Sequence, residues 1–342
     1  MRFTETVEPT AELTIAAFRF VERCAYWNLW LDILDDVAIA CHGTFPVLES
    51  SILMRLGQAQ FQQGLTSQSL KTLHKAEMLV STIQDEKLLL QFMFRLGTSY
   101  LGIIKYQKAE THMQHVLASV DAEKSPIFWI AAKNVCAIIA LEKGAFLQAG
   151  NLFGEVASFA KRNKLRTQQI LVLANWSNAL IKQGQFEEAE KKIVDAFALI
   201  LSTDGEYYSN FLRLCEVRLF YGRGEWQDAR IVLETISVPN LVHNRQDNLL
   251  AEVEYIRAQI LLKQDKLENA EKSVNVAKRI WRDCGKRSRY ARSVGLWSQI
   301  KYKQENPMAT RYIYQSLDLL APYMEIYESR EMVAELDKLV NC

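Results

Sequence analysis

Apolar and small residues recur along the chain with a period of about forty residues. One position of this pattern is always small, and it is occupied by Ser69, Ala109, Ala149, Ala189, Ala229, Ala270 and Ala309. Four residues later stands a large apolar residue, which is Leu73, Met113, Phe153, Ile193, Leu233, Val274 or Ile313. Three residues further on, a second apolar or small residue follows. These offsets share one face of an α-helix, so the pattern predicts that each repeat ends in a helix with one buried face.

The residues upstream of the small position predict a second helix in each repeat. Twelve residues before it the chain carries Gly57, Gly97, Ala137, Ser177, Val217 and Ala258, which are mostly small and allow close helix packing. Five residues before it stand Gly64, Gly144, Gly184 and Gly224, and glycine suits a helix end because it tolerates positive φ. Three residues before it stand Tyr106, Phe146, Phe186, Trp226 and Leu267. Each repeat is therefore predicted to be a helix, a short glycine turn and a second helix.

Eight such repeats and one further helix account for the chain, which we predict to be a single solenoid over residues 1–342. The predicted repeats are 10–42, 47–82, 87–120, 126–160, 167–202, 207–238, 247–281 and 288–321. The first repeat is degenerate, with Tyr26 in the aromatic position, Leu29 in the small position and Ile33 in the large apolar position. The segment 323–340 is predicted to be a helix that caps the last pair through Met324, Tyr327, Met332, Leu336 and Leu339.

The prolines support these boundaries. Proline is excluded from helix interiors because it lacks the amide hydrogen and its ring clashes with the preceding turn. The six prolines are Pro9, Pro46, Pro126, Pro239, Pro307 and Pro322. All six fall at predicted boundaries, and Pro9 is expected to precede the first helix.

The repeat resembles the tetratricopeptide repeat family, and the segment IKQGQFEEAEKKIVDAFAL (181–199) matches the family pattern well. The resemblance implies an all-α, right-handed superhelical solenoid of antiparallel helix pairs. The longer period here is similar to that of the sensor regions of bacterial MalT-like (STAND) regulators and of quorum-peptide receptors. Those proteins usually carry an ATPase or DNA-binding module as well, but GKRS (285–288) lacks the upstream glycine of a phosphate-binding loop.

The resemblance also implies a binding surface, because the first helix of each pair lines the concave face in this family. The inward positions would be Phe61, Phe94, Asn134, Asn178, Arg218, Tyr221, Tyr255, Gln259, Arg292, Gln299 and Tyr302. Aromatic residues and arginine often dominate binding energy, and amides can hydrogen-bond an extended peptide. The alternative is that several of these side chains only pack against neighbouring helices.

A second candidate is a basic cluster formed by Lys278, Arg279, Arg282, Lys286, Arg287 and Arg289, followed by Arg292. Asp283 is the single acidic residue among them. Cations near the end of a helix stabilise its carbonyl end, which explains part of the cluster. The other reading is a site for nucleic acid or an acidic partner.

Composition changes this picture little. The 342 residues carry a net charge of +1, so no global field favours nucleic acid or an anionic membrane. Six dispersed cysteines and the absence of an apolar leader or a long apolar segment predict a cytoplasmic protein without membrane segments. The pair His112 and His115 lacks nearby partners for a metal site, and the sequence contains no catalytic motif that we recognise. We therefore predict a non-enzymatic scaffold or sensor that binds a protein or peptide without metal or cofactor. The alternative is a transcription-linked regulator whose basic cluster contacts nucleic acid.

Overall fold

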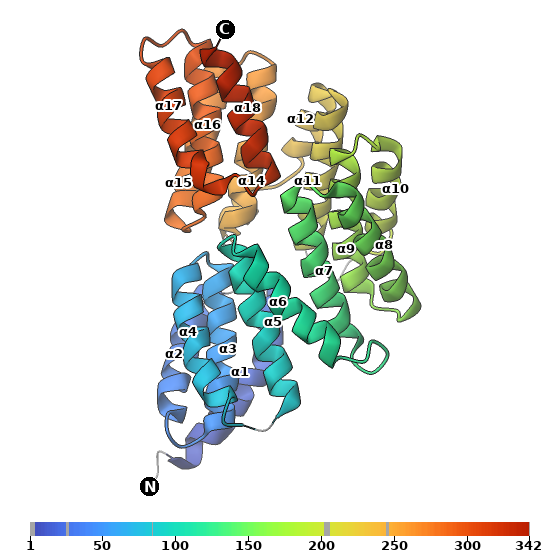
Figure 1. The fold of residues 1–342 in the computed structure, drawn as a ribbon, viewed down its shortest axis with the longest axis vertical. Helices are drawn as coiled ribbons and strands as arrows, with labels where there is room; N and C mark the ends of the chain where they lie inside the picture. Colours follow the sequence, from blue (N-terminus) through green and yellow to red (C-terminus); the bar gives the residue numbers. More distant parts are fainter. Residues whose placement is uncertain (1–3, 25–26, 84, 202–205, 244–245, 342) are drawn as a thin grey trace. The chain divides into compact units, whose positions relative to one another are not determined.

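The computed structural model describes residues 4–24, 27–83, 85–201, 206–243 and 246–341. Over these ranges the chain forms eighteen α-helices and one short 3-10 helix, and it contains no strand. Consecutive helices pack against one another in pairs, as Figure 1 shows. The predicted all-α fold of tetratricopeptide-like helix pairs is therefore confirmed.

Eight pairs and a final helix follow one another along the chain. The first helices of the pairs are α1 (Thr4–Cys24), α3 (Pro46–Gln62), α5 (Glu86–Gly102), α7 (Pro126–Lys143), α9 (Arg166–Lys182), α11 (Glu206–Arg223), α14 (Asp247–Lys263) and α16 (Arg287–Lys303). The second helices are α2 (Trp27–Cys41), α4 (Thr66–Val80), α6 (Tyr106–Ser119), α8 (Phe146–Arg162), α10 (Phe186–Phe197), α12 (Trp226–Glu234), α15 (Leu267–Asp283) and α17 (Ala309–Leu320). The remaining elements are α13 (Val238–His243), the 3-10 helix η1 (Ala321–Tyr323) and α18 (Tyr327–Val340).

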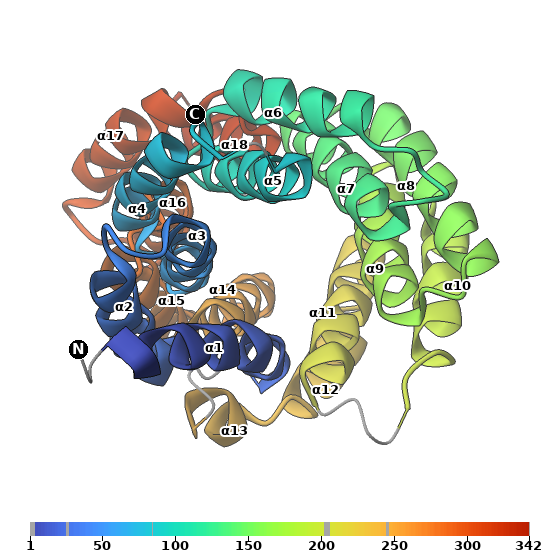
Figure 2. The same ribbon diagram turned by 90° about the horizontal axis from the view of Figure 1, so that it is seen from below.

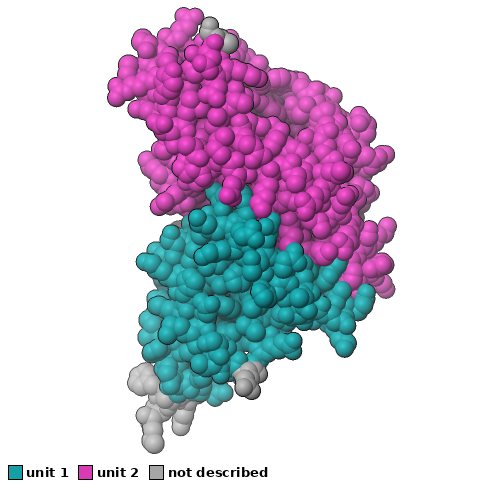
Figure 3. Space-filling model, viewed as in Figure 1, with its two compact units in different colours: residues 1–132 teal, residues 133–342 magenta. Residues whose placement is uncertain are grey.

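The helices gather into two compact units, which are coloured separately in Figure 3. Unit 1 comprises residues 1–132, and unit 2 comprises residues 133–342. A continuous apolar core in unit 1 joins α1 to α5. In unit 2 one cluster lies between α11, α12 and α14, and another extends from α14 to α18. The repeat pattern runs through both units.

The predicted positions of the repeat are the ones that the structure buries. In the third and fourth pairs the small, large and third positions are all fully buried, at Ala109, Met113 and Val116 and at Ala149, Phe153 and Val156. The four glycines of the predicted turns have φ values of 73° to 86° (Gly64 78°, Gly144 86°, Gly184 73°, Gly224 80°). Such turns let the chain reverse direction between the two helices of a pair. Figure 2 shows α7 and α9 on one side, with their partners α8 and α10 on the other.

The first repeat departs from the predicted register by one residue. Leu34, Val37 and Cys41 are buried, whereas Ile33 is 37% exposed. The buried face therefore starts from Trp30, and the step to Ser69 is 39 residues, not 40. Tyr26 lies outside the described residues, and the side chain of Leu29 is not described either.

Three boundaries differ from the prediction. Pro9 does not precede the first helix but lies inside α1, which begins at Thr4. The ring of Pro9 is exposed and stands close to the helix start, so the missing amide removes a single hydrogen bond. Pro239 was expected in a loop, but it occupies the second position of the short helix α13, where a proline is tolerated. The final helix was predicted to start at residue 323, but residue 323 ends η1 and α18 starts at Tyr327.

Candidate ligand-binding face of unit 2

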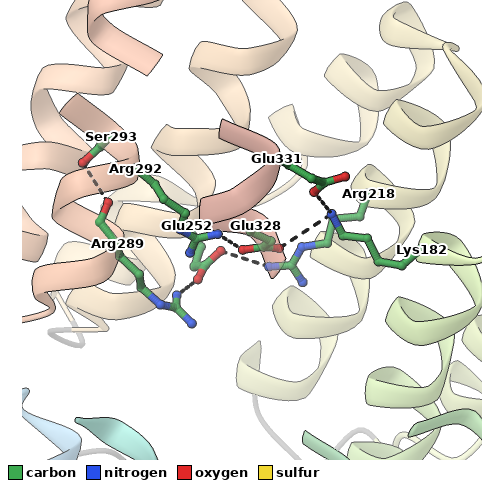
Figure 4. Close-up of polar contacts among 8 residues, drawn as sticks. All are labelled: Lys182, Arg218, Glu252, Arg289, Arg292, Ser293, Glu328 and Glu331. Carbon is green, nitrogen blue, oxygen red and sulfur yellow. Dashed lines mark hydrogen bonds and ion pairs between the residues drawn. The ribbon is translucent and has the colours of Figure 1, made fainter. Parts of the chain in front are cut away.

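The first helices of unit 2 contribute charged side chains to one shared face. Lys182 ends α9, Arg218 lies on α11, Glu252 on α14, and Arg289 and Arg292 lie one turn apart on α16. We call the surface formed by these five residues the inner face of unit 2. Figure 4 shows that Glu328 and Glu331 of α18 point into it.

Ion pairs connect these side chains in two groups. The Glu252 carboxylate pairs with Arg218, at 3.0 Å from Nη2, and also with Arg289. In the second group, Lys182 Nζ lies 3.0 Å from Glu331 and 3.9 Å from Glu328. Glu328 also pairs with Arg292. The inner face thus holds four cations against three carboxylates, and two of those carboxylates belong to α18 (Figure 4).

Helix α18 has an apolar side and an acidic edge. On the apolar side, Met332 and Leu336 are buried against α16, and Gly295 of α16 allows the close approach. The acidic edge consists of Glu328, Glu331 and Glu335, whose spacing of three and four residues aligns them along the helix. Glu335 accepts a hydrogen bond of 2.8 Å from Gln299 Nε2 of α16.

The first turn of α18 also reaches the start of unit 2. The Tyr327 ring packs edge-on against Phe146, with centroids 4.7 Å apart. Arg330 Nη2 donates a 2.8 Å hydrogen bond to the carbonyl of Lys143, the last residue of α7. A guanidinium at this position satisfies a carbonyl left open by the helix end. Repeats in a simple solenoid contact only their neighbours, so this contact between residues 187 apart is an additional closure.

Two of the arginines are partly exposed and partly desolvated. The side chains of Arg218 and Arg289 keep 29% and 31% of their exposure to solvent. Burial nevertheless lowers the pKa of both guanidinium groups, and it brings the pKa of Arg289 to about 10 with help from the nearby charge of Arg292. The two guanidinium groups are therefore partly shielded from water, although each keeps some exposure to solvent.

Two tyrosines lie in the same region. Burial raises the pKa of Tyr221 and of Tyr255 to about 12, and the nearby Glu331 and Glu335 add to the shift. Tyr255 packs on Trp281, with ring centroids 5.3 Å apart, and Tyr221 packs on Trp226. The neutral phenol is therefore the form that the folded state favours.

This shift predicts a loss of stability at high pH. A group whose pKa is raised on folding stabilises the fold below its ordinary pKa of 10, and this contribution disappears as the pH rises towards 12. We expect Tyr255→Phe to lose less stability than the unaltered chain between pH 10 and 12, as measured by urea denaturation. The exposed Tyr314 provides the control, and Tyr314→Phe should behave like the unaltered chain. Equal losses in all three proteins would contradict the assignment.

The structure brings together five of the predicted groove residues, which are Arg218, Tyr221, Tyr255, Arg292 and Gln299. Asn134 of α7 and Asn178 of α9 lie on earlier helices of the same unit, and Asn134 Oδ1 accepts a hydrogen bond from Asn175. Gln259 is half-buried on α14, and Tyr302 is exposed near the end of α16. Phe61 and Phe94 lie in unit 1, where both are half-buried.

The basic cluster is divided among different surroundings. Arg279, Arg282 and Arg287 are exposed. Lys278 lies over the Trp297 ring at 4.5 Å, whereas Arg289 pairs with Glu252 and burial lowers the pKa of Lys286. The nucleic-acid hypothesis stays a prediction, and the three exposed arginines are the members that remain available to it.

Sequence reasoning missed Lys182, Glu252 and the acidic edge of α18. It treated the last helix as an apolar cap and did not examine its polar side. The spacing of Glu328, Glu331 and Glu335 was the available signal, since it marks a continuous acidic stripe. Nothing local to α18 indicated which helices that stripe would meet.

The described part of the chain carries neither a metal-binding cluster nor a membrane-spanning helix. Within it, no group of three or more His, Cys, Asp or Glu side chains is arranged to hold a metal ion. The His112 ring stacks on Tyr100 in unit 1, and burial lowers its pKa. None of the described helices combines the length and apolar character needed to span a bilayer.

Solved structures share this fold. A Rap protein complexed with Competence and Sporulation Factor matches 98% of this chain and 98% of its own length, with a TM-score of 0.62 at 11% identity. The Rap conjugation gene regulator of plasmid pLS20, solved with the Phr* peptide, matches 86% and 77%, with a TM-score of 0.61 at 14% identity. A tetratricopeptide repeat protein from Parabacteroides merdae matches 80% and 93%, with a TM-score of 0.51 at 15% identity.

No family model and no curated protein matches the sequence. At the identities found, the structural matches establish the fold alone, and the likeness to MalT-like regulators stays a prediction. The helix pairs, the buried repeat positions and these matches agree with one another. The chain therefore has the tetratricopeptide-like fold, a solenoid of packed helix pairs.

Proposed function

We propose that this chain is a non-enzymatic scaffold or sensor that binds a peptide or a protein segment on the inner face of unit 2. The observation that carries the proposal is the convergence of Arg218, Arg289 and Arg292 with the buried Tyr255 and the half-buried Tyr221. Arginine and tyrosine are the residue types that most often dominate binding energy, particularly where they are partly desolvated.

The structural matches support the proposal. The Rap protein that covers nearly this whole chain was solved with Competence and Sporulation Factor, and the pLS20 regulator was solved with a peptide. A solenoid gives such proteins a long face built from successive first helices. A protein or peptide partner, as predicted from the sequence, is the ligand class that fits a face of this kind.

The test compares matched variants of the inner and the outer side. Arg218→Ala with Tyr221→Ala removes an inner-face arginine and the tyrosine three residues after it on α11, which lies near Glu331 and Glu335. Arg311→Ala with Tyr314→Ala removes the same two residue types at the same spacing from exposed positions of α17. Peptides selected from a random displayed library on the unaltered chain would be titrated against both variants by fluorescence anisotropy.

We expect the inner variant to weaken binding by about tenfold or more, and the outer variant to leave it unchanged. Circular dichroism must show that both variants keep their helical content. The proposal fails if the library yields no peptide that binds, or if the selected peptides bind both variants as well as they bind the unaltered chain.

A further inference from the structure

The charge balance of the inner face depends on α18. Lys182 pairs with Glu328 and Glu331, and Arg292 pairs with Glu328 (Figure 4). If the first turn of α18 moved away, Glu252 would be the one carboxylate left among the ion pairs that join the four cations. Lys182, Arg218, Arg289 and Arg292 would then form a positively charged surface, which attracts acidic ligands.

Two buried polar atoms near this surface lack a hydrogen-bond partner within the described part of the chain. Among the described residues, neither Arg292 Nε nor Asn178 Oδ1 has a hydrogen-bond partner. Asn178 stands one turn before Lys182 on α9, so the two side chains share a face of that helix. A buried polar atom without a partner is destabilising, and a bound chain with its own donors and acceptors would satisfy both atoms.

The contact between α18 and the cations is suited to exchange. Glu328 and Glu331 remain 46% and 43% exposed and Lys182 33%, so the two ion pairs of Lys182 are partly hydrated and individually weak. The Arg292 side chain is 11% exposed, so its pair with Glu328 is better shielded from water. The apolar side of α18 is held by α16 and not by α9 or α11. Met332 and Leu336 can therefore stay packed on α16 while the first turn leaves Lys182 and Arg292, a movement that also breaks the Tyr327–Phe146 and Arg330–Lys143 contacts.

We propose that the inner face of unit 2 binds an acidic segment of a partner protein, and that Glu328 and Glu331 of α18 occupy this site when the partner is absent. This inference rests on the proposed function and specifies its ligand. The acidic edge of α18 shows the chemistry that the site accepts: carboxylates spaced three or four residues apart on a helix. An amphipathic helix with such a stripe is a recurrent ligand of helical grooves.

The test uses the full chain and two labelled peptides. One peptide has the sequence of α18, and the other has the same sequence with its glutamates at 328, 331 and 335 replaced by glutamine. Binding is measured by fluorescence anisotropy for the unaltered chain and for three double variants. These are Glu328→Gln with Glu331→Gln, Lys182→Gln with Arg292→Gln, and the control Lys161→Gln with Arg162→Gln at exposed positions of α8.

We expect the acidic peptide to bind the Glu328→Gln/Glu331→Gln chain about tenfold more tightly than the unaltered chain, since the two carboxylates of α18 no longer compete for Lys182 and Arg292. Lys182→Gln with Arg292→Gln should abolish this binding, whereas the control should not change it. Added salt should weaken binding of the acidic peptide more than binding of the glutamine-substituted peptide, because only the former carries the acidic stripe. Hydrogen exchange should show faster exchange of α18 amides when the acidic peptide is bound.

Three results would overturn the inference. They are equal binding of the acidic and glutamine-substituted peptides, no gain in the Glu328→Gln/Glu331→Gln chain, and tighter binding of a short single-stranded DNA than of the acidic peptide. The last result would assign the cations to nucleic acid. If library peptides still bind the inner face while the acidic preference is missing, this inference fails and the proposed function stands.

Discussion

Replacing Trp281 by alanine should lower the free energy of unfolding by about 3–5 kcal/mol, the range expected when a large aromatic side chain is removed from a well-packed core. Trp281 is 1% exposed and lies near the end of α15, within the cluster that joins α14 to α18. Its ring packs on Tyr255, and the Arg289 guanidinium lies over it at 5.8 Å. The cavity left by alanine would loosen both side chains as well.

Urea denaturation followed by far-ultraviolet circular dichroism measures this effect. Leu147→Ala provides the control, because Leu147 is exposed on α8 and should change the stability by no more than about 0.5 kcal/mol. Trp281→Phe should fall between the two, since it keeps an aromatic ring and removes an indole nitrogen that has no hydrogen-bond partner among the described residues. A Trp281→Ala chain as stable as the Leu147→Ala control would show that this cluster is not part of the cooperative core.

Replacing Glu252 by glutamine should cost about 2–3 kcal/mol, somewhat less than the loss of one partner from a fully buried ion pair. The Glu252 side chain is 17% exposed, and its carboxylate serves both Arg218 and Arg289. Protein already surrounds both guanidinium groups, as the lowered pKa of each shows. Without the carboxylate, two desolvated cations face each other without compensation.

A rescue experiment separates this charge effect from a packing defect. Adding Arg289→Gln to Glu252→Gln removes one of the two opposed cations, so the double variant should recover part of the lost stability. Glu234→Gln removes a carboxylate from an exposed pair on α12 and should leave the denaturation midpoint unchanged within error. If Arg289→Gln adds a further loss in place of a recovery, the ion pairs of Glu252 do not explain its contribution.

The fold was predictable because its signal is local and repeated. A small residue such as Ala149 and a large one such as Phe153 stand one helical turn apart, and the same pair recurs seven times. Each copy therefore supports the helix assignment of the others. The prediction failed at α1 and α2, where the spacing changes by one residue and no earlier repeat fixes the register.

The candidate site was predictable only in part, for a physical reason. Arg218, Tyr221 and Arg292 were found because they occupy inward positions of first helices. The partners of Lys182 and Lys143 on α18 lie 149 and 187 residues away, and no local pattern specifies such a pairing. The number of charges along the sequence did not predict which cations contribute to the site either. Arg282 and Arg289 are close in sequence, but only Arg289 pairs with Glu252.

The hydrogen bond from Arg330 to Lys143 gives unit 2 the properties of a closed loop of repeats. An open stack of repeats can fray from its last member inwards, because the terminal repeat has one neighbour. Here the last helix is hydrogen-bonded to the first pair of the unit, so this bond must break before either end unfolds separately. A ligand that takes the place of this bond would therefore change the mechanical continuity of the whole unit as well as filling a site.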